Sequence, residues 1–353
     1  SDLLPYAYLW IVFRIQNISF IKSRIFLSLS VGMALAASCN RTASSSSSHD
    51  QSTVQEEDST LANKSDKSFS LNTSRALLAS RLESLEKLKS VVKIAYFLDT
   101  SSSDTVDHWS KVRLSYFDNG REIISELESG ISQGDIIKAR DGDIAARFDL
   151  VFNEPDALAN REDMRKIYLL SRRRHFIFGE GDVAFYDFAE IATKKINTKK
   201  LAFKTSRDSS EKGYINTFNH VTAQAFITSI FSEEMADFIA DLHELDNMPE
   251  LTSGNFSESQ LTDPDKNPMD NYVDLINNEI GQEIGKQLKA RYNINRHTLW
   301  TPELLTSYVN DLQAYYSWAF QIGFGPFTPN ETVITRFSDK LNKVLSEETS
   351  QEA

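Results

Sequence analysis

Apolar residues recur at helical spacing in three neighbouring segments of the C-terminal half, residues 214–231, 232–245 and 270–288. At about 100° of rotation per residue, the apolar positions of each segment fall on one side of a helix, with charged positions opposite. We therefore predict three amphipathic helices that pack on one another.

Each predicted helix also carries a polar side chain within its apolar face. His220 falls beside Ala223 and Ile227 in the first helix, and His243 falls between Ala236 and Ile239 in the second. In the third helix Asn277 lies among apolar residues, with Asp274 and Asn278 along the adjoining edge. A buried polar group without a partner costs about 1–3 kcal/mol, so we expect these groups to meet one another.

Two glycines lie four residues apart on the third predicted helix, Gly281 and Gly285. Each costs about 1 kcal/mol relative to alanine inside a helix. Their shared stripe therefore predicts that a neighbouring helix approaches closely there.

Upstream, between residues 111 and 206, the apolar pattern changes towards a period of two. Three hairpins are predicted, because strand-like runs flank Asp118-Asn119-Gly120, Asp141-Gly142 and residues 179–182. A short helix is predicted at 161–170, a longer one over 73–97, and two more at 301–322 and 331–345. The fold class is then α+β, with a β-rich antiparallel middle region followed by a mainly α-helical C-terminal domain.

The domain boundaries follow from this pattern. Residues 73–208 form the helix and antiparallel-sheet region, residues 209–346 form the helical domain with the polar cluster, and 347–353 form a tail. The long polar stretch 246–269 is interpreted either as a lid beside the polar cluster or as an insertion.

The first 72 residues differ in character from the rest. Residues 25–38 (IFLSLSVGMALAAS) form an apolar run preceded by Lys22 and Arg24 and followed by Cys39. This resembles a bacterial lipoprotein signal, with 1–39 as the upstream segment and signal peptide and Cys39 as the lipidation site. The alternative is a transmembrane anchor. Residues 40–72 are rich in serine and poor in large apolar residues, as is typical of a disordered tether.

Charge and cysteine content exclude some classes of function. The net charge is −12, which argues against a nucleic-acid-binding protein because such a protein needs a basic surface. The single cysteine excludes an internal disulfide. One basic cluster, Arg172-Arg173-Arg174-His175, is either a solvated edge or a contact for an anionic ligand.

The polar residues of the three helices favour a metal site. His220, His243 and Asp274 are the expected ligands, since three protein ligands and an open position are typical of catalytic zinc sites. Glu244 would either support a ligand by hydrogen bonding to it or act as general base, and Asn277 and Asn278 would orient ligands or hold substrate. Two alternatives remain open, a metal-free histidine base oriented by Asp274 and a purely structural hydrogen-bonded cluster.

The same residues carry a resemblance. The segments FNHVTAQAF, FSEEMADFIADLHE and VDLINNEIG resemble an uncharacterised bacterial domain of secreted and toxin-like proteins. The matching positions are His220, His243, Glu244, Asp274, Asn277, Asn278 and Gly281. Near His220 the chain departs from the pattern, with Asn219 where the domain tends to have arginine. The resemblance covers about 70 residues and implies a site without naming a reaction.

Together these features predict a lipoprotein of the bacterial cell envelope, anchored to a membrane through lipidated Cys39 and facing the periplasm or exterior. Its helical domain would hold a metal-assisted hydrolase site with a divalent metal such as zinc and a cell-envelope substrate. One alternative is a non-catalytic lipoprotein that binds a protein partner or ligand, and another is a toxin-like secreted effector.

Overall fold

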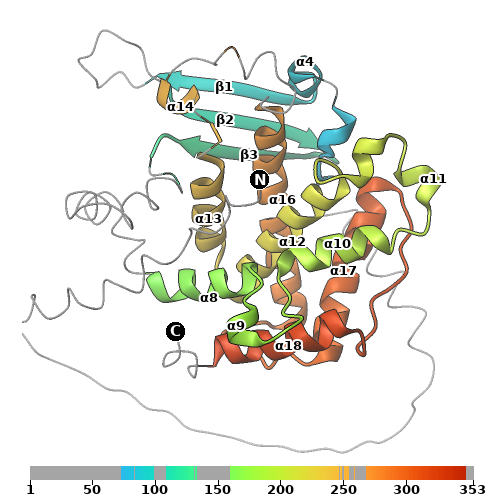
Figure 1. Cartoon of the computed structure of the whole chain (residues 1–353). Helices are drawn as coiled ribbons and strands as arrows, with labels where there is room; N and C mark the ends of the chain where they lie inside the picture. Colours follow the sequence, from blue (N-terminus) through green and yellow to red (C-terminus); the bar gives the residue numbers. More distant parts are fainter. Residues whose placement is uncertain are drawn as a thin grey trace, which may run out of the picture.

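A three-stranded antiparallel sheet comes first along the chain, and a mainly helical region follows it, as the α+β prediction requires (Figure 1). The computed structural model describes residues 73–98, 109–132, 160–253, 258 and 268–346, apart from 83, 131, 246 and 249. None of the helices in these ranges is both long and apolar enough to span a membrane.

The sheet has the order β1-β2-β3 and consists of β1 (Val92–Leu98), β2 (Trp109–Asp118) and β3 (Arg121–Glu128). The predicted hairpin at residues 118–120 is confirmed as the β2–β3 turn, where Asn119 and Gly120 have φ of 53° and 74°. This two-residue turn needs positive φ at both positions, which asparagine and glycine tolerate best. Alternate residues of β3 point inward, so one face of the sheet packs on the helices.

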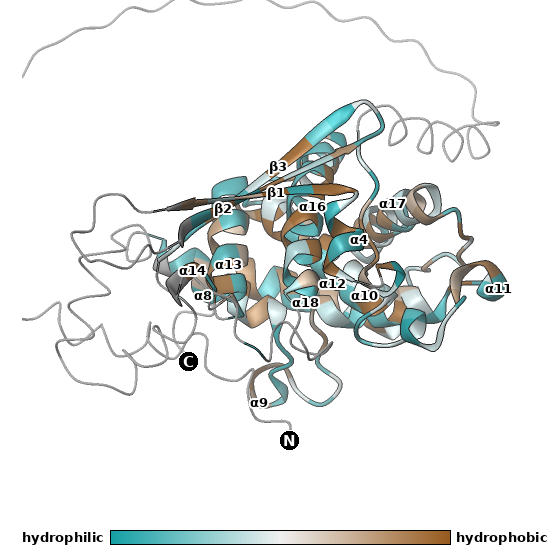
Figure 2. Ribbon diagram, turned by 90° about the horizontal axis from the view of Figure 1, so that it is seen from above, coloured by the Kyte–Doolittle hydropathy of each residue, from teal (hydrophilic) through white to brown (hydrophobic). Residues whose placement is uncertain are grey.

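The helical region confirms the predicted helices at 161–170, 214–231, 232–245, 270–288, 301–322 and 331–345. They correspond to α8 (Arg161–Ser171), α12 (Tyr214–Ile230), α13 (Glu233–Leu245), α16 (Met269–Tyr292), α17 (Pro302–Phe320) and α18 (Thr332–Leu345). The shorter helices are α4 (Leu85–Lys89), α9 (His175–Phe178), α10 (Phe185–Lys194), α11 (Lys199–Ala202) and α14 (Glu250–Ser253), with 3-10 turns η2 (Ala79–Arg81) and η3 (Ser206–Ser209). Seen from above, the strands lie across α13 and α16 (Figure 2).

α12 lies at the centre of the helices, because α10, α13 and α16 all pack against it. Its burial therefore extends well beyond the single apolar face expected from the sequence, and includes Thr217, Thr222 and Gln224. α8 and α10 precede residue 209 in the chain, yet α10 packs on α12 and α8 packs on α18.

α12 and α16 run parallel, as the contacts between them show. Asn216 hydrogen bonds to Asp274, His220 to Asn278 and Gln224 to Gln282, always with a sequence difference of 58. A constant difference means that both helices advance in the same direction, four residues at a time. Parallel neighbours need a long connection, and here it passes through α13 and α14.

The two glycines of α16 permit this packing, as predicted. A Cβ atom on Gly281 would lie 2.8 Å from the Val221 carbonyl oxygen, and one on Gly285 would lie 2.7 Å from the Ala225 carbonyl oxygen. Both distances are shorter than van der Waals contact, so no side chain fits between the backbones of α12 and α16 at these two positions.

The predicted helix over 73–97 is wrong. Residues 73–78 are extended, and the rest of the segment divides into η2, α4 and β1. The backbone of the extended part bonds to side chains of distant helices. The Leu77 N–H and carbonyl pair with the amide of Asn277, and the Ala76 N–H donates to the hydroxyl of Tyr315. Buried leucines spaced three to four apart satisfied the helical pattern, but these tertiary partners determine the conformation.

The hairpin predicted around residues 179–182 is also wrong, because α9 and α10 flank this turn. Asp187 explains the start of α10, since its carboxylate accepts a hydrogen bond of 2.7 Å from the Ala184 backbone N–H. Such a bond satisfies a donor that the first helical turn leaves free. The hairpin predicted around Asp141-Gly142 lies outside the described residues.

We predict that Gly285→Ala destabilises the protein even though alanine is the better helix former by about 1 kcal/mol. The added methyl group must push α12 and α16 apart, and such overpacking costs about 1–3 kcal/mol. Urea unfolding measures the change, with Gly325→Ala as control because its Cβ would meet nothing closer than 3.9 Å. A Gly285→Ala protein more stable than the wild type would contradict the close packing.

Candidate metal centre

The parallel packing of α12 on α16 brings His220 to Asp274. The Nε2 atom of His220 lies 3.4 Å from Oδ2 of Asp274, and both side chains are largely buried. Asn216, one turn earlier on α12, donates from Nδ2 to both carboxylate oxygens of Asp274 at 2.9 and 3.1 Å. These contacts fix the carboxylate at the edge of the helix pair.

The second nitrogen of His220 determines its tautomer. Nδ1 lies 2.9 Å from Oδ1 of Asn278, and an amide oxygen only accepts hydrogen bonds. In the neutral imidazole the proton is therefore on Nδ1, and Nε2 presents a lone pair to Asp274. An oxygen and a nitrogen that both offer lone pairs at 3.4 Å need a proton or a cation between them.

Glu244 completes this group from α13. The inward stripe of α13 runs through Ala236, Ala240 and Glu244, each four residues after the last, and Glu244 is 2% exposed. Its Oε1 atom has no hydrogen-bond partner among the described residues. One ligand atom from each of His220, Glu244 and Asp274 lies within 4.8 Å of the other two. The three side chains thus converge on one point from three helices.

Burial controls the protonation of both carboxyl groups. The pKa of Glu244 is raised well above 4.5, first by desolvation and then by the negative charge of Asp274. The pKa of Asp274 is raised well above 3.8 by desolvation and by Asp270, while the bond from Asn216 opposes the shift. Two neighbouring buried carboxylates are unfavourable unless a proton or a cation compensates their charge.

His243 lies one step round α13 from Glu244 and occupies a different position from the one expected. The residue retains some exposed surface although protein atoms surround its ring, and its ring centroid is 6.3 Å from that of His220. The structure thus groups His220 and Asp274 with Glu244, and places His243 in the wall of the adjoining cavity. The small Ala236 and Ala240 explain this, because they let α13 rotate its 236–240–244 stripe inward.

His243 is neutral near pH 7. Its pKa is lowered from 6.5 to about 4, first because the protein atoms around the ring reduce its hydration, and then by the positive charges of His220 and Arg172. His243 also lines the cavity, where a neutral imidazole can accept a hydrogen bond.

The two asparagines of α16 have separate tasks. Asn277 is fully buried and uses both ends of its amide on the Leu77 backbone, with bonds of 2.8 and 2.9 Å. It holds the extended segment 73–78 and does not face the cavity. Asn278 orients His220 and lines the cavity, and its Nδ2 atom has no hydrogen-bond partner among the described residues.

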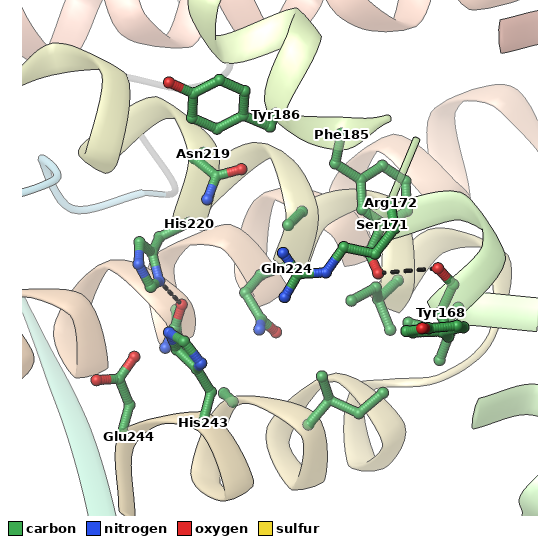
Figure 3. A pocket seen from close by; sticks show the side chains of 16 residues that line it. Tyr168, Ser171, Arg172, Phe185, Tyr186, Asn219, His220, Gln224, His243 and Glu244 are labelled. Atoms are coloured by element: carbon green, nitrogen blue, oxygen red, sulfur yellow. Dashed lines mark hydrogen bonds between the residues drawn. The ribbon is translucent and has the colours of Figure 1, made fainter. Parts of the chain in front are cut away.

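A cavity of about 250 Å³ opens beside His220 and Glu244 (Figure 3). His220, His243 and Glu244 lie at one end of the view, and Arg172 extends into the cavity towards Gln224 from the other side (Figure 3). Asn219, Tyr186 and Ser171 also line it. Asp274 lies behind His220 and is not part of the cavity wall.

The sequence analysis missed three residues at this site, namely Asn216, Gln224 and Tyr186. The spacing offered a signal for Asn216, which lies one helical turn before His220. The three arginines of the basic cluster make different contacts. Arg172 lines the cavity, Arg173 pairs with Asp187, and the guanidinium of Arg174 lies 4.1 Å from the centre of the Tyr168 ring.

Comparisons with protein families, curated proteins and solved structures find no match to this chain. The resemblance to the domain of secreted and toxin-like proteins therefore stays a prediction. Cys39 and the segment around it lie outside the described residues, so the lipoprotein signal also stays a prediction.

We predict that Asn277→Ala and Asn278→Ala separate structure from function. Asn277→Ala leaves the Leu77 N–H without its partner and lowers the free energy of unfolding by about 1–3 kcal/mol. Asn278→Ala removes only the orienting bond to His220, so it costs less stability and weakens metal binding by roughly 10–100-fold. Chemical denaturation and zinc titration measure the two effects. Equal losses of stability with unchanged zinc affinity would show that both asparagines are structural.

Proposed function

We propose that His220, Glu244 and Asp274 bind a divalent cation, and that this chain is an envelope lipoprotein which uses the cation to assist a hydrolysis. One observation carries the proposal: three atoms that accept hydrogen bonds face one another. His220 Nε2 and Asp274 Oδ2 lie 3.4 Å apart, and beside them lies Oε1 of Glu244, which has no hydrogen-bond partner among the described residues. A cation at their centre satisfies all three at once.

The donor set supports a transition metal. One imidazole nitrogen and two carboxylate oxygens suit zinc, and also manganese or iron, better than they suit calcium, which prefers six or more oxygens. Zinc at about 2.0–2.2 Å from each ligand would bring the ligand atoms to roughly 3.5 Å apart. The present separations of up to 4.8 Å require only small rotations of the side chains.

The cavity supports the hydrolytic role. A bound metal lowers the pKa of a water ligand towards 7, so that a hydroxide forms near neutral pH. His243 stands in the cavity wall, with its ring centroid 6.3 Å from that of His220, and a neutral imidazole there can accept a hydrogen bond from that water or from a substrate. In this proposal Glu244 is a ligand, and not the general base that the sequence analysis expected.

The place of action rests on the sequence. The apolar run before Cys39 and the polar tether that follows support attachment to a membrane through a lipidated Cys39, with the folded part on the periplasmic or outer side. The acidic net charge of −12 argues against a nucleic-acid substrate.

We predict that the purified protein binds about one equivalent of zinc, and that His220→Ala and Glu244→Gln each weaken binding about tenfold or more. Each change removes one ligand, and tenfold in affinity corresponds to about 1.4 kcal/mol. Titration with a competing chelator measures the affinities, and His297→Ala serves as control because His297 is exposed and outside the cavity. If the folded wild-type protein binds no zinc, manganese or iron, the metal site is contradicted and the cluster of His220, Glu244 and Asp274 is purely structural.

We predict that metal binding strengthens as pH rises. The raised pKa values of Glu244 and Asp274 mean that these groups keep protons in the metal-free protein at pH values where free carboxyls have lost them. The metal must displace those protons, so binding releases them. Calorimetry in buffers of different ionisation enthalpy measures the number of protons released on metal binding near pH 6.5. We expect Glu244→Gln to release fewer protons than the wild type.

The same shifts have a consequence for stability. Because the native pKa of each group exceeds its unfolded value, the metal-free protein loses stability as pH rises from about 4 towards the native pKa values. The increase in melting temperature on adding zinc should therefore be larger at pH 8 than at pH 5. An increase that is the same at both pH values would contradict the binding of zinc by these carboxyls.

A further inference from the structure

We propose that one end of the outer face of the sheet rests on the surface of the membrane that holds the lipid anchor, with Phe117 in contact with the lipids. This inference rests on the anchoring through Cys39 in the proposed function, and it adds a second contact that orients the folded part. Its support comes from the place where the tether enters the fold, from an exposed apolar patch beside that place, and from the charges around the patch.

The first described residues are bound to the β2–β3 turn. The Thr73 carbonyl accepts a hydrogen bond of 2.9 Å from Nδ2 of Asn119, and the Arg75 backbone N–H donates to the Asp118 carboxylate at 2.8 Å. The guanidinium of Arg75 also pairs with Asp118 at 3.0 Å. The predicted tether of residues 40–72 therefore joins the folded part at this end of the sheet.

The length of the tether limits which surfaces meet the membrane most often. A flexible chain as long as residues 40–72 has a root-mean-square end-to-end distance of about 30 Å. A compact domain of about 200 residues has a radius of gyration of roughly 16 Å, so the anchor stays within about one domain diameter of the β2–β3 turn. Surfaces beside this turn therefore face the membrane more often than those on the far side.

An apolar patch lies on the outer face of the sheet beside the same turn. The pairing of β2 with β3 makes Phe117 and Ile124 diagonal neighbours on this face. The pairing of β1 with β2 places Val91 beside Phe117, one position beyond the pair of Val92 and Tyr116. Phe117 is 70% exposed, Val91 43% and Ile124 37%. Single exposed apolar residues are ordinary, but neighbours that include an aromatic ring indicate a contact surface.

The charges around the patch suit an anionic lipid surface. α4 lies at this end of the sheet and leads directly into β1 (Figure 1). Three lysines and two glutamates are exposed around the patch, and two arginines there pair with carboxylates, which leaves an excess of one positive charge. These residues are Lys87, Lys89 and Lys93, Glu86 and Glu122, and the pairs of Arg75 with Asp118 and of Arg121 with Glu283. Because the whole chain carries a net charge of −12, an anionic bilayer repels this region less than the rest.

The two kinds of side chain divide the contact between them. An aromatic ring gains free energy when it leaves water for the boundary between headgroups and acyl chains, and lysine ammonium groups remain among the lipid phosphates. Phe176 on α9 is the rival, because it is 81% exposed. α9 lies at the opposite end of the structure from the sheet (Figure 1), so the entry point of the tether favours Phe117.

Fluorescence of the mature, lipidated protein on vesicles tests this inference. The vesicles contain equal parts of phosphatidylcholine and phosphatidylglycerol, with a nitroxide-labelled lipid as quencher. Cys39 is the one native cysteine and carries the lipid, so Glu122→Cys provides a single thiol for a fluorophore. Glu128→Cys is the matched control, because both glutamates are exposed on the outer face of β3 and lie about 20 Å apart along the strand.

We expect the lipids to quench the fluorophore at position 122 much more than the one at position 128. Adding Phe117→Ser should remove most of the quenching at position 122 while the lipid keeps the protein on the vesicles, because serine has no apolar ring to bury. Phe176→Ser should leave the quenching unchanged. Vesicles of phosphatidylcholine alone should quench less, since they lack the negative charges that attract the lysines.

Equal quenching at positions 122 and 128, or quenching that survives Phe117→Ser, overturns this inference and leaves the anchor standing. Quenching of a fluorophore on His175→Cys in place of position 122 overturns it in favour of α9. A fluorescence change at position 122 that needs no vesicles and grows with protein concentration overturns it in favour of a second copy of the chain. A mature protein whose mass shows no lipid on Cys39 overturns the proposed anchoring and this inference together.

Discussion

The close parallel packing of α12 on α16 is the constraint on which the site depends. At Gly281 and Gly285 the two helices approach until no side chain fits between their backbones. That approach sets a register in which every fourth residue of one helix meets every fourth residue of the other. His220 meets Asn278 because of this register, and its second nitrogen faces Asp274 as a result. A small change in helix separation would break each of these pairs.

Polar groups are numerous in this core, and most of them have identifiable structural partners. Asn277 and Tyr315 bind the backbone of the extended segment 73–78, which allows that segment to cross the helices without regular structure of its own. Lys340 and Asp182 form a buried pair that anchors the loop after α8. Oε1 of Glu244 is among the buried side-chain atoms that have no hydrogen-bond partner within the described residues, and it lies beside His220 and Asp274. Burying a carboxyl oxygen without a partner costs free energy, and its position beside two further ligand atoms is the reason we propose a bound cation there.

The cavity combines two kinds of surface that arise from different parts of the chain. The helices α12, α13 and α16 supply His220, Glu244 and Asp274, the proposed metal ligands, while Arg172 follows directly after α8. Arg172 and His243 line the same cavity although 71 positions separate them in the chain, and the charge of Arg172 contributes to lowering the pKa of His243.

The sequence by itself determined the α+β class, the boundaries of the long helices and the β2–β3 turn, because periodicity and turn residues act locally. It also identified most of the residues that meet at the site, since histidine, asparagine and aspartate on apolar faces need partners. Only the tertiary structure decided which of them converge. Glu244 and His243 are adjacent on α13, so their side chains point about 100° apart around the helix axis. The periodic pattern does not decide which of the two faces the interior, because both lie near the edge of the apolar face. The extended segment 73–78 likewise follows from Asn277 and Tyr315, about 200 residues or more away in the chain, and long-range hydrogen bonds of this kind leave no mark on the local pattern.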